Sequence, residues 1–536
     1  RIFSENVKPQ VYHPAGWSDG EEYGSLIKVD VLPPKPEQPQ GQLTIFDDYE
    51  RDLRVWNFKR LLAQKYDVVV TNPPYMGDNG MNAKLTQFIK DYFPDSKTDF
   101  FAAFIEKCSA LLVTGGYQAM ITMESWMFLS SFAILRKKIL SGHTIINLVH
   151  MPYLGKGGTS LGINFGTSAF VFKKQKIKEY QAQYDYIRYF ETDDDGIPLT
   201  FPTINERYKK AKSDDFSQIP GTPIAYWVSD AIFSAFATGT NITKYVDTFQ
   251  GIITGNNDKF LRKWYEVVLD KVALHKEKMA QIDLSKQYWL PYNKGGDFRK
   301  WYGNQEYIVY WKNGPDDKTR GKKGFSDFYL REYASWSYIT SSTLASRYFP
   351  KGFLWDVSGS GIFDKSDMLY YLMSFIGSKV GIEMLKIINP TINYQVENIA
   401  QLPVLLGSKE RVDALVEENI AHARIDWDSF ETSWDFKHHP LINGERTVAE
   451  AFSKWKETAN NRFDTLKANE EELNRIFIDI YGLQDELTPE VEEKDVTVHR
   501  IYDSREDIPE SMAGSRYALT KQDVIKSFIS YAVGCM

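Results

Sequence analysis

The chain has 536 residues, of which 43% are hydrophobic and 25% charged, so it is long enough for about two to four domains of ordinary globular composition. Its net charge of −7 excludes a uniformly basic nucleic-acid binder. Two cysteines, Cys108 and Cys535, exclude a disulfide framework, and the sequence has no signal peptide or membrane-spanning apolar run. We therefore expect a cytoplasmic protein without membrane contact.

The first regular element is expected after residues 1–60, which have little periodicity and read as a linker or an insertion. Tyr66–Tyr75 (YDVVVTNPPY) is expected to form a strand that ends in a rigid turn. The run Val68–Val70 has the composition of a parallel strand covered on both faces, and Pro73 cannot donate to a sheet ladder. The result is a stiff loop at the carboxyl end of a strand, where open α/β sheets bind ligands.

The residues of this loop suit chemistry on the exocyclic amine of adenine, whose lone pair is delocalised into the ring. Two acceptors that take hydrogen bonds from its two N–H groups would localise that lone pair. The Asn72 side-chain oxygen and the Pro73 carbonyl can serve as those acceptors. Proline offers a carbonyl without a competing N–H. Tyr75 can stack on the face of an extruded base. No strong general base is required, because the amine loses its proton after attack.

At Asn72, Pro73, Pro74 and Tyr75 the sequence resembles the amino-type DNA methyltransferases, whose adenine-N6 members carry Asn-Pro-Pro-Tyr. The resemblance implies that these four residues are catalytic and that S-adenosyl-L-methionine is the cofactor, with Asn72 also in contact with it. The alternatives are a plain proline-rich turn, or methylation of a glutamine or of an RNA amine. No glycine-rich loop precedes Tyr66, so the remainder of the cofactor site is expected upstream of Arg1.

Alternating helices and strands follow the motif and favour a Rossmann-like, doubly wound α/β sheet, partial because its N-terminal part is missing. We expect helices at Lys84–Tyr92, Asp99–Leu112 and Trp126–Leu140, and strands at Tyr117–Thr122, Ile145–His150 and Thr167–Phe172. Asp99 is expected to cap the second helix and Gly115–Gly116 to end it. The catalytic core is thus placed at residues 61–180, with a polar connector at 181–220.

The resemblance implies further binding residues. Phe104 falls where related enzymes line the cofactor adenine pocket, although its period suits a helix core equally well. Tyr153, with Phe165 as its rival, falls where related enzymes place a second aromatic side chain against the flipped base. No spacing of His, Cys and Asp indicates a metal site, so none is expected.

Residues 221–405 are expected to form a mixed α+β target-recognition domain. Residues 251–350 contain 20 aromatic side chains and 17 Lys and Arg against 11 Asp and Glu, a mixture that suits contact with bases and phosphates. Many of the aromatic residues must nevertheless be core. The candidate DNA-binding residues are Arg299, Lys300, Arg320, Lys322 and Lys323. Phe353–Gly361 imitates a cofactor loop, as a permuted enzyme would have, but a lone Gly-x-Gly is a weak signal.

Residues 406–536 are expected to form a helical C-terminal region, with helices at Arg411–Ile425, Val448–Leu466 and Glu470–Tyr481. They end in an acidic stretch, Asp485–Asp495. Such a stretch can dock a partner protein, although solvation is its usual explanation.

Several segments, in matching order, resemble the PglX family, the adenine-specific DNA methyltransferases of BREX phage-defence systems. They are Asn72–Gly77, Phe93–Lys97, Met123–Ser131, Gly251–Phe260, Tyr292–Gly303, Asn389–Tyr394 and Asn474–Gly482. The resemblance implies N6 methylation of a flipped adenine at a short asymmetric site in double-stranded DNA, with other BREX proteins as partners. The alternatives are a sequence-specific DNA-recognition subunit of a defence complex in which methylation is secondary, or a restriction-modification fusion.

Overall fold

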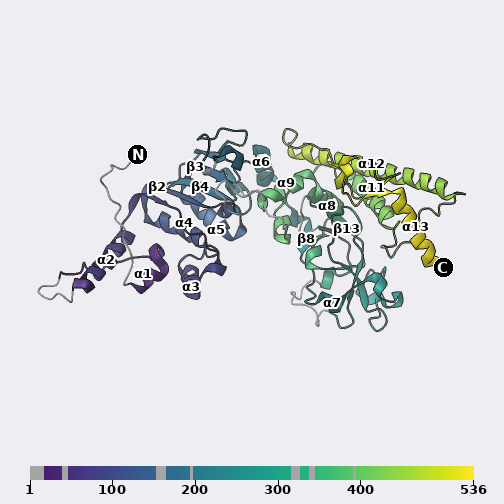
Figure 1. The fold of residues 1–536 in the computed structure, drawn as a ribbon, viewed down its shortest axis with the longest axis horizontal. Helices are drawn as coiled ribbons and strands as arrows, with labels where there is room; N and C mark the ends of the chain where they lie inside the picture. The colour runs from purple at the N-terminus through teal and green to yellow at the C-terminus, as the bar shows by residue number, and fades with distance from the viewer. Residues whose placement is uncertain are drawn as a thin grey trace. The chain divides into compact units, whose positions relative to one another are not determined.

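The computed structural model describes residues 17–38, 46–151, 165–193, 197–314, 326–336, 344–389 and 394–536. The chain divides into two compact units, Arg1–Val228 and Ser229–Met536 (Figure 1). Both mix helices with strands. Among the described residues, no helix is long and apolar enough to cross a membrane.

The first unit is built on a six-stranded mixed sheet in the order β1-β2-β4-β3-β5-β6. Its strands are β1 Tyr66–Thr71, β2 Leu112–Met123, β3 Thr144–Met151, β4 Thr167–Lys173, β5 Gln181–Tyr186 and β6 Lys209–Lys212. Its helices are α1 Ser18–Tyr23, α2 Phe46–Ala63, α3 Ala83–Tyr92, α4 Phe100–Leu111 and α5 Ala133–Gly142. Strands β1 and β2 pair in parallel, as do β3 and β5, whereas the other three neighbours are antiparallel.

Strand β1 departs from the prediction that both of its faces are covered. Val68 and Val70 are 56% and 72% exposed. Successive side chains of a strand point to opposite faces, so Val68 and Val70 share one face, and that face of β1 is exposed. The apolar composition predicted the strand correctly, but it could not tell how many neighbours cover it.

Two further local predictions are corrected. Gly115–Gly116 do not end the second helix, because α4 stops at Leu111 and both glycines lie inside β2. A Cβ at Gly116 would come within 2.8 Å of the Asp67 carbonyl oxygen, so glycine is needed there for the close approach of β1 to β2. The long helix expected from Trp126 is two short 3₁₀ turns followed by α5.

The connector predicted at residues 181–220 is part of the sheet. Strands β5 and β6 extend it beyond β3, and the first unit continues to Val228. The polar composition of these strands suits their place at the outer edge, where one face meets solvent.

The second unit contains two four-stranded sheets, ordered β14-β10-β11-β9 and β13-β12-β15-β8. Its strands are β7 Thr240–Asn241, β8 Val246–Phe249, β9 Leu261–Lys263, β10 Trp289–Asn293, β11 Tyr307–Tyr310, β12 Tyr333–Trp336, β13 Ser346–Phe349, β14 Leu354–Trp355, β15 Gly361–Asp364, β16 Pro403–Val404, β17 Arg500–Tyr502 and β18 Ala518–Thr520. The segment that imitates a cofactor loop runs from β14 of one sheet towards β15 of the other, rather than from a strand into a helix. Its aromatic residues are core, since Trp355 is fully buried.

Helices surround these sheets: α6 Asp230–Thr238, α7 Asn257–Phe260, α8 Leu369–Gly377, α9 Lys379–Ile388, α10 Val396–Ile399, α11 Lys409–Trp427, α12 Val448–Tyr481 and α13 Lys521–Cys535. Helix α12 is one helix of 34 residues where the sequence predicted two. It starts with a capping box between Thr447 and Glu450 and ends at Gly482, whose φ is +66°. Figure 1 shows α11 and α12 side by side, and they pack together.

Candidate active site

The Asn72–Tyr75 loop leaves β1 at its carboxyl end, as predicted. Asn72 is exposed, Pro73 is buried and Tyr75 is partly buried. The Tyr75 hydroxyl donates to Asn72 Oδ1 at 3.0 Å and lies 3.2 Å from the carbonyl oxygen of Ile121 in β2. Burial raises the pKa of the Tyr75 phenol, so it stays protonated and able to donate. The phenol thus ties the loop to the neighbouring strand and orients the Asn72 amide.

Asp99 holds the other end of the loop. Its carboxylate accepts from the backbone N–H of Phe101 at 3.3 Å, which confirms the predicted N-cap of α4. The same oxygen accepts from the N–H of Met76 at 3.2 Å, and the N–H of Phe100 donates to the Met76 carbonyl at 3.0 Å. The helix cap therefore also anchors the segment that follows the Asn72–Tyr75 loop. The sequence showed the cap but not this second role.

The Tyr75 ring stands in an aromatic cluster. It meets Phe165 edge to face, with ring centroids 5.4 Å apart, and Phe101 in the same manner at 6.2 Å. Of the two aromatic residues considered for base stacking, the structure therefore brings Phe165 to Tyr75. Tyr153 lies outside the described residues.

Phe104 lies on α4 and is partly exposed. Its ring meets Phe100 at a centroid distance of 5.2 Å, and both pack with Met76 against a cluster of buried residues that includes Leu85 and Ile89. The side chain thus combines a structural contact with free surface near the loop.

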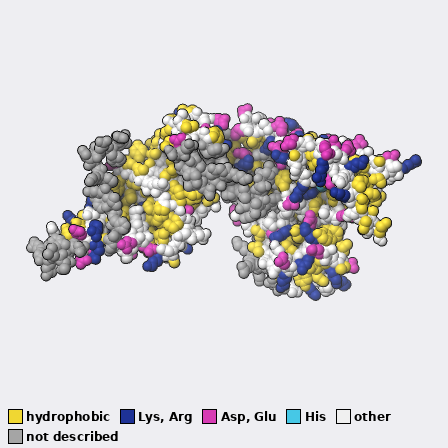
Figure 2. Space-filling model, viewed as in Figure 1, with side chains coloured by type: hydrophobic (Ala, Val, Ile, Leu, Met, Phe, Trp, Pro, Cys, Tyr) yellow, Lys and Arg dark blue, Asp and Glu magenta, His cyan; other side chains and the backbone are white. Residues whose placement is uncertain are grey.

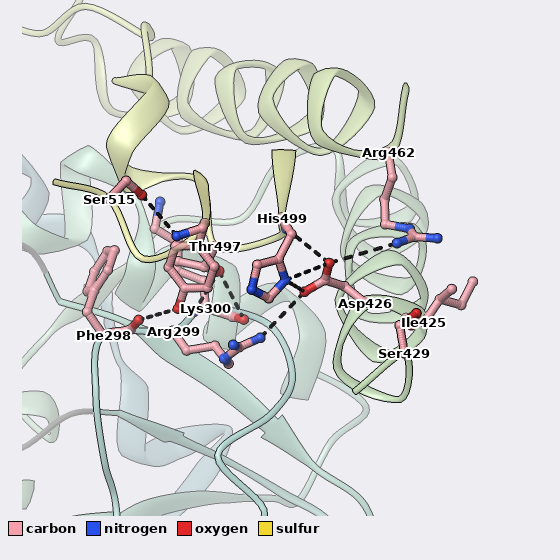
Figure 3. A network of polar contacts seen from close by, with 11 residues as sticks. Phe298, Arg299, Lys300, Ile425, Asp426, Ser429, Arg462, Thr497, His499 and Ser515 are labelled. Atoms are coloured by element: carbon pink, nitrogen blue, oxygen red, sulfur yellow. Dashed lines mark hydrogen bonds and ion pairs between the residues drawn. The ribbon is translucent and has the colours of Figure 1, made fainter. Parts of the chain in front are cut away.

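Arg299 and Lys300, predicted to bind DNA, are instead turned into the second unit (Figure 3). Lys300 pairs with Glu470 of α12 at 2.7 Å. Arg299 is 7% exposed, and its guanidinium lies 4.9 Å from the ring of Trp427 and 5.1 Å from that of Tyr517. Because both cationic groups have internal partners, their surroundings favour a structural role. Arg320, Lys322 and Lys323 lie outside the described residues.

Figure 3 shows the carboxylate around which this network is arranged. Asp426 of α11 is buried and accepts from the backbone N–H of His499 at 3.0 Å; its other oxygen lies 2.9 Å from His499 Nδ1. Arg299 and Arg462 approach it at 3.7 and 3.8 Å. Burial opposes ionisation, but His499 and Arg299 outweigh it and lower the pKa of Asp426. The charges of the 298–300 loop are thus neutralised inside the protein. On the face in Figure 2, charges of both signs are interspersed over this unit.

The loop, its aromatic neighbours and the mixed sheet point to a class of enzyme. The Eco57I restriction-modification methylase family matches residues 24–155, which include β1, the Asn72–Tyr75 loop and α4. This part of the first unit is thus similar to the Eco57I methylases.

Longer relatives cover almost the whole chain. It is 37% identical over 559 aligned residues, or 96% of its length, to the adenine-specific methyltransferase PglX of Lacticaseibacillus casei (strain Zhang). It is 33% identical over 89% of its length to the adenine-specific methyltransferase BrxX of Escherichia coli O9:H4 (strain HS). The chain is thus a homologue of the PglX and BrxX adenine-specific methyltransferases. It spans 44% and 38% of these two relatives, less than half of each.

Among solved structures, the type IIL restriction-modification enzyme MmeI in complex with DNA matches 79% of this chain and 55% of its own chain. The TM-score is 0.44 and the sequence identity is 12%.

Proposed function

We propose that the chain is part of an adenine-specific DNA methyltransferase of the BREX type. It would methylate N6 of a flipped adenine at a short asymmetric site in double-stranded DNA, in the cytoplasm and with other BREX proteins as partners. The observation that carries the proposal is the exposed Asn72 next to Pro73 at the carboxyl end of β1, held between Tyr75 and the Asp99 cap. The homology to PglX and BrxX supports the choice of substrate.

The Asn72 amide oxygen and the Pro73 carbonyl oxygen would accept hydrogen bonds from the two N–H groups of the adenine amine. The Tyr75 hydroxyl already donates to Asn72 Oδ1. This contact keeps the oxygen and the NH₂ group of the amide from exchanging places, and the oxygen retains a second lone pair for the substrate. The loop therefore presents its acceptors in a fixed orientation before the substrate arrives. Such preorganisation lowers the cost of reaching the transition state.

The flipped base would lie against the aromatic cluster of Tyr75 and Phe165. Both rings are only partly buried, so each has surface to offer to a base. Stacking on aromatic side chains is the usual way to hold an extruded base. Tyr153 stays a second candidate for this contact.

S-adenosyl-L-methionine would supply the methyl group from its sulfonium. The residues present fit such a ligand, because Asn72 is exposed and Phe104 keeps part of its ring free beside the loop. Asn72 would hold the amine in line with the methyl donor, and Phe104 would stack against the adenine of the cofactor. Correct alignment of two reactants supplies much of the acceleration.

The fold supports a finer assignment for each unit. In the first, the loop lies where a doubly wound sheet binds ligands, and we assign its mixed sheet to a Rossmann-like methyltransferase domain. In the second, the paired four-stranded sheets with their aromatic core would form the target-recognition domain, and the helices from residue 406 onward would support it.

The test is methyl transfer by the complete protein to DNA that lacks N6-methyladenine, with mass spectrometry of the released nucleosides. We expect N6-methyladenine from the unaltered protein and none above background from Asn72→Ala. The control is Asn79→Ala, which changes an exposed asparagine outside the motif. A product other than N6-methyladenine, or full activity of Asn72→Ala, would contradict the proposal.

A further inference from the structure

Three polar side chains form a chain of contacts close to the aromatic cluster of the catalytic loop. Glu124 directly follows β2, His150 lies near the end of β3, and Tyr226 comes from the last residues of the first unit. His150 Nε2 is 2.6 Å from Glu124 Oε2, and His150 Nδ1 is 2.9 Å from the Tyr226 hydroxyl oxygen. His150 and Tyr226 are 5% and 2% exposed. Neither the Eco57I match nor the Asn-Pro-Pro-Tyr chemistry gives these residues a role.

Each contact in this chain has the geometry of a hydrogen bond. A carboxylate can only accept, so His150 Nε2 carries a proton and donates to Glu124. Burial, with nearby tyrosines and acidic groups, raises the pKa of Tyr226 well above its ordinary value. The phenol therefore stays protonated, and its oxygen lies within hydrogen-bond distance of His150 Nδ1. Every contact is satisfied, which fixes the imidazole and the carboxylate in place.

Glu124 is joined in turn to the residue beside Phe165. Its backbone N–H donates to the Gly166 carbonyl at 2.9 Å. A Cβ at Gly166 would lie 2.1 Å from the Glu124 carboxyl carbon, a distance that real atoms do not reach. An alanine at position 166 would therefore displace the Glu124 carboxylate, which packs directly on the Gly166 backbone. The preceding residue, Phe165, is the one whose ring meets Tyr75.

We infer that Glu124, His150 and Tyr226 are positioning residues that set the Phe165 ring beside Tyr75 and thereby shape the adenine site. The contacts run without a gap from Tyr226 through His150 and Glu124 to the backbone that carries Phe165. The inference rests on the proposed function and deepens it. These residues act on the aromatic wall of the base site, whereas Asn72 and Pro73 act on the amine.

The same strand offers a matched control. His143 immediately precedes β3, at the opposite end from His150, and its Nε2 lies 2.8 Å from the Ser109 hydroxyl. His150 is buried and His143 partly buried; His143 has one ring nitrogen against a side-chain oxygen, whereas His150 has two. Replacement of either by glutamine removes an imidazole from the same unit. Only His150 is connected to Phe165 through Glu124.

The experiment uses the complete protein and a duplex with 2-aminopurine at the target adenine, whose fluorescence reports unstacking and contact with aromatic side chains. We expect Glu124→Ala, His150→Gln and Gly166→Ala to change the bound fluorescence and to lower kcat by roughly tenfold to a hundredfold, the cost of a small misplacement of reacting groups. Their KM for S-adenosyl-L-methionine should stay unchanged. Glu124→Gln keeps an acceptor for Nε2–H and should recover most of the rate, and His143→Gln should match the unaltered protein.

The outcomes separate the two proposals. If the unaltered protein methylates DNA and Glu124→Ala and Gly166→Ala match His143→Gln in rate and fluorescence, the positioning role is wrong while the proposed function stands. Equal thermal stability of His150→Gln and His143→Gln, with a fluorescence change in the former alone, would support the positioning role over a general structural one. No transfer by the unaltered protein would overturn the proposed function and this inference with it.

Discussion

Among single residues, Tyr75 has two roles in the proposed site. Its hydroxyl orients Asn72, and its ring faces Phe165, where the proposed flipped base would lie. Tyr75→Phe removes only the hydroxyl. The loss of one hydrogen bond corresponds to about 1 kcal/mol, so kcat/KM should fall by roughly fivefold to tenfold. Tyr75→Ala removes the ring as well and should cost more. Steady-state kinetics on the target duplex check both, and equal losses in the two variants would contradict the separate role of the hydroxyl.

His439 should make stability depend on pH. It is 1% exposed, and its Nδ1 accepts from the Leu441 N–H at 3.2 Å. Burial lowers the pKa of His439 from 6.5 to about 4. The unfolded chain therefore takes up a proton that the folded protein excludes, and this contribution to stability is complete above pH 6.5 and is lost as the pH falls towards 4.

His439→Gln keeps an acceptor for Leu441 but cannot titrate. The free energy of unfolding should therefore fall less for this variant than for the unaltered protein between about pH 7 and about pH 5. Denaturant titrations at the two pH values measure the difference. An equal fall in both proteins would show that His439 is not the group responsible.

The residues of the site differ in how far sequence alone could find them. The Asn72–Tyr75 loop and the Asp99 cap were predictable, because each depends on neighbours a few residues away. Arg299 and Lys300 were predicted to bind DNA, and the structure gives each of them an internal partner. Their partners, Asp426 and Glu470, lie more than a hundred residues further along the chain. A sequence shows where Lys and Arg occur, but not which distant carboxylate will pair with them.

At the scale of elements, helix α12 shows the same limit. The sequence predicted two helices, Val448–Leu466 and Glu470–Tyr481, with a break at residues 467–469. The structure continues the helix through them and buries Glu470, which is 4% exposed and accepts from Lys300 Nζ and Trp301 Nε1, both at 2.7 Å. Lys300 and Trp301, which lie far from Glu470 in the sequence, thus supply the partners that let this glutamate be buried within one continuous helix.

This pairing gives a stability prediction. Glu470→Ala leaves the Lys300 ammonium without its carboxylate in a largely buried site, which should lower the free energy of unfolding by about 3 kcal/mol or more. The double variant Glu470→Met with Lys300→Met removes both charges and should recover much of the loss. Denaturant unfolding checks the pair. A loss in the double variant as large as that in Glu470→Ala would contradict the explanation by an unpaired charge.

At the scale of the whole molecule, the chain consists of two units, each with its own sheets. The sequence predicted the alternation of helices and strands in the first. It missed the last two strands of that sheet, β5 and β6, because their polar residues resemble a connector. The sequence also did not predict the exposed face of β1. A run of valines has the same composition whether one or both faces of its strand are covered.

The second unit should fold without the first. Its two four-stranded sheets and its apolar clusters around Leu290 and Phe349 are made of residues from Ser229 onward. A fragment of residues 229–536 should therefore unfold in a single cooperative transition, followed by circular dichroism on heating. A fragment that melts gradually would show that its core needs the rest of the chain.

The central claim is that the Asn72–Tyr75 loop methylates adenine in DNA. The most direct measurement is long-read sequencing of DNA from cells that carry the complete protein, its partner genes and either Asn72 or Asn72→Ala. The account predicts N6-methyladenine at one asymmetric site with the unaltered protein and none at that site with the variant. Identical methylation in the two, or no methylation with the partners present, would contradict it.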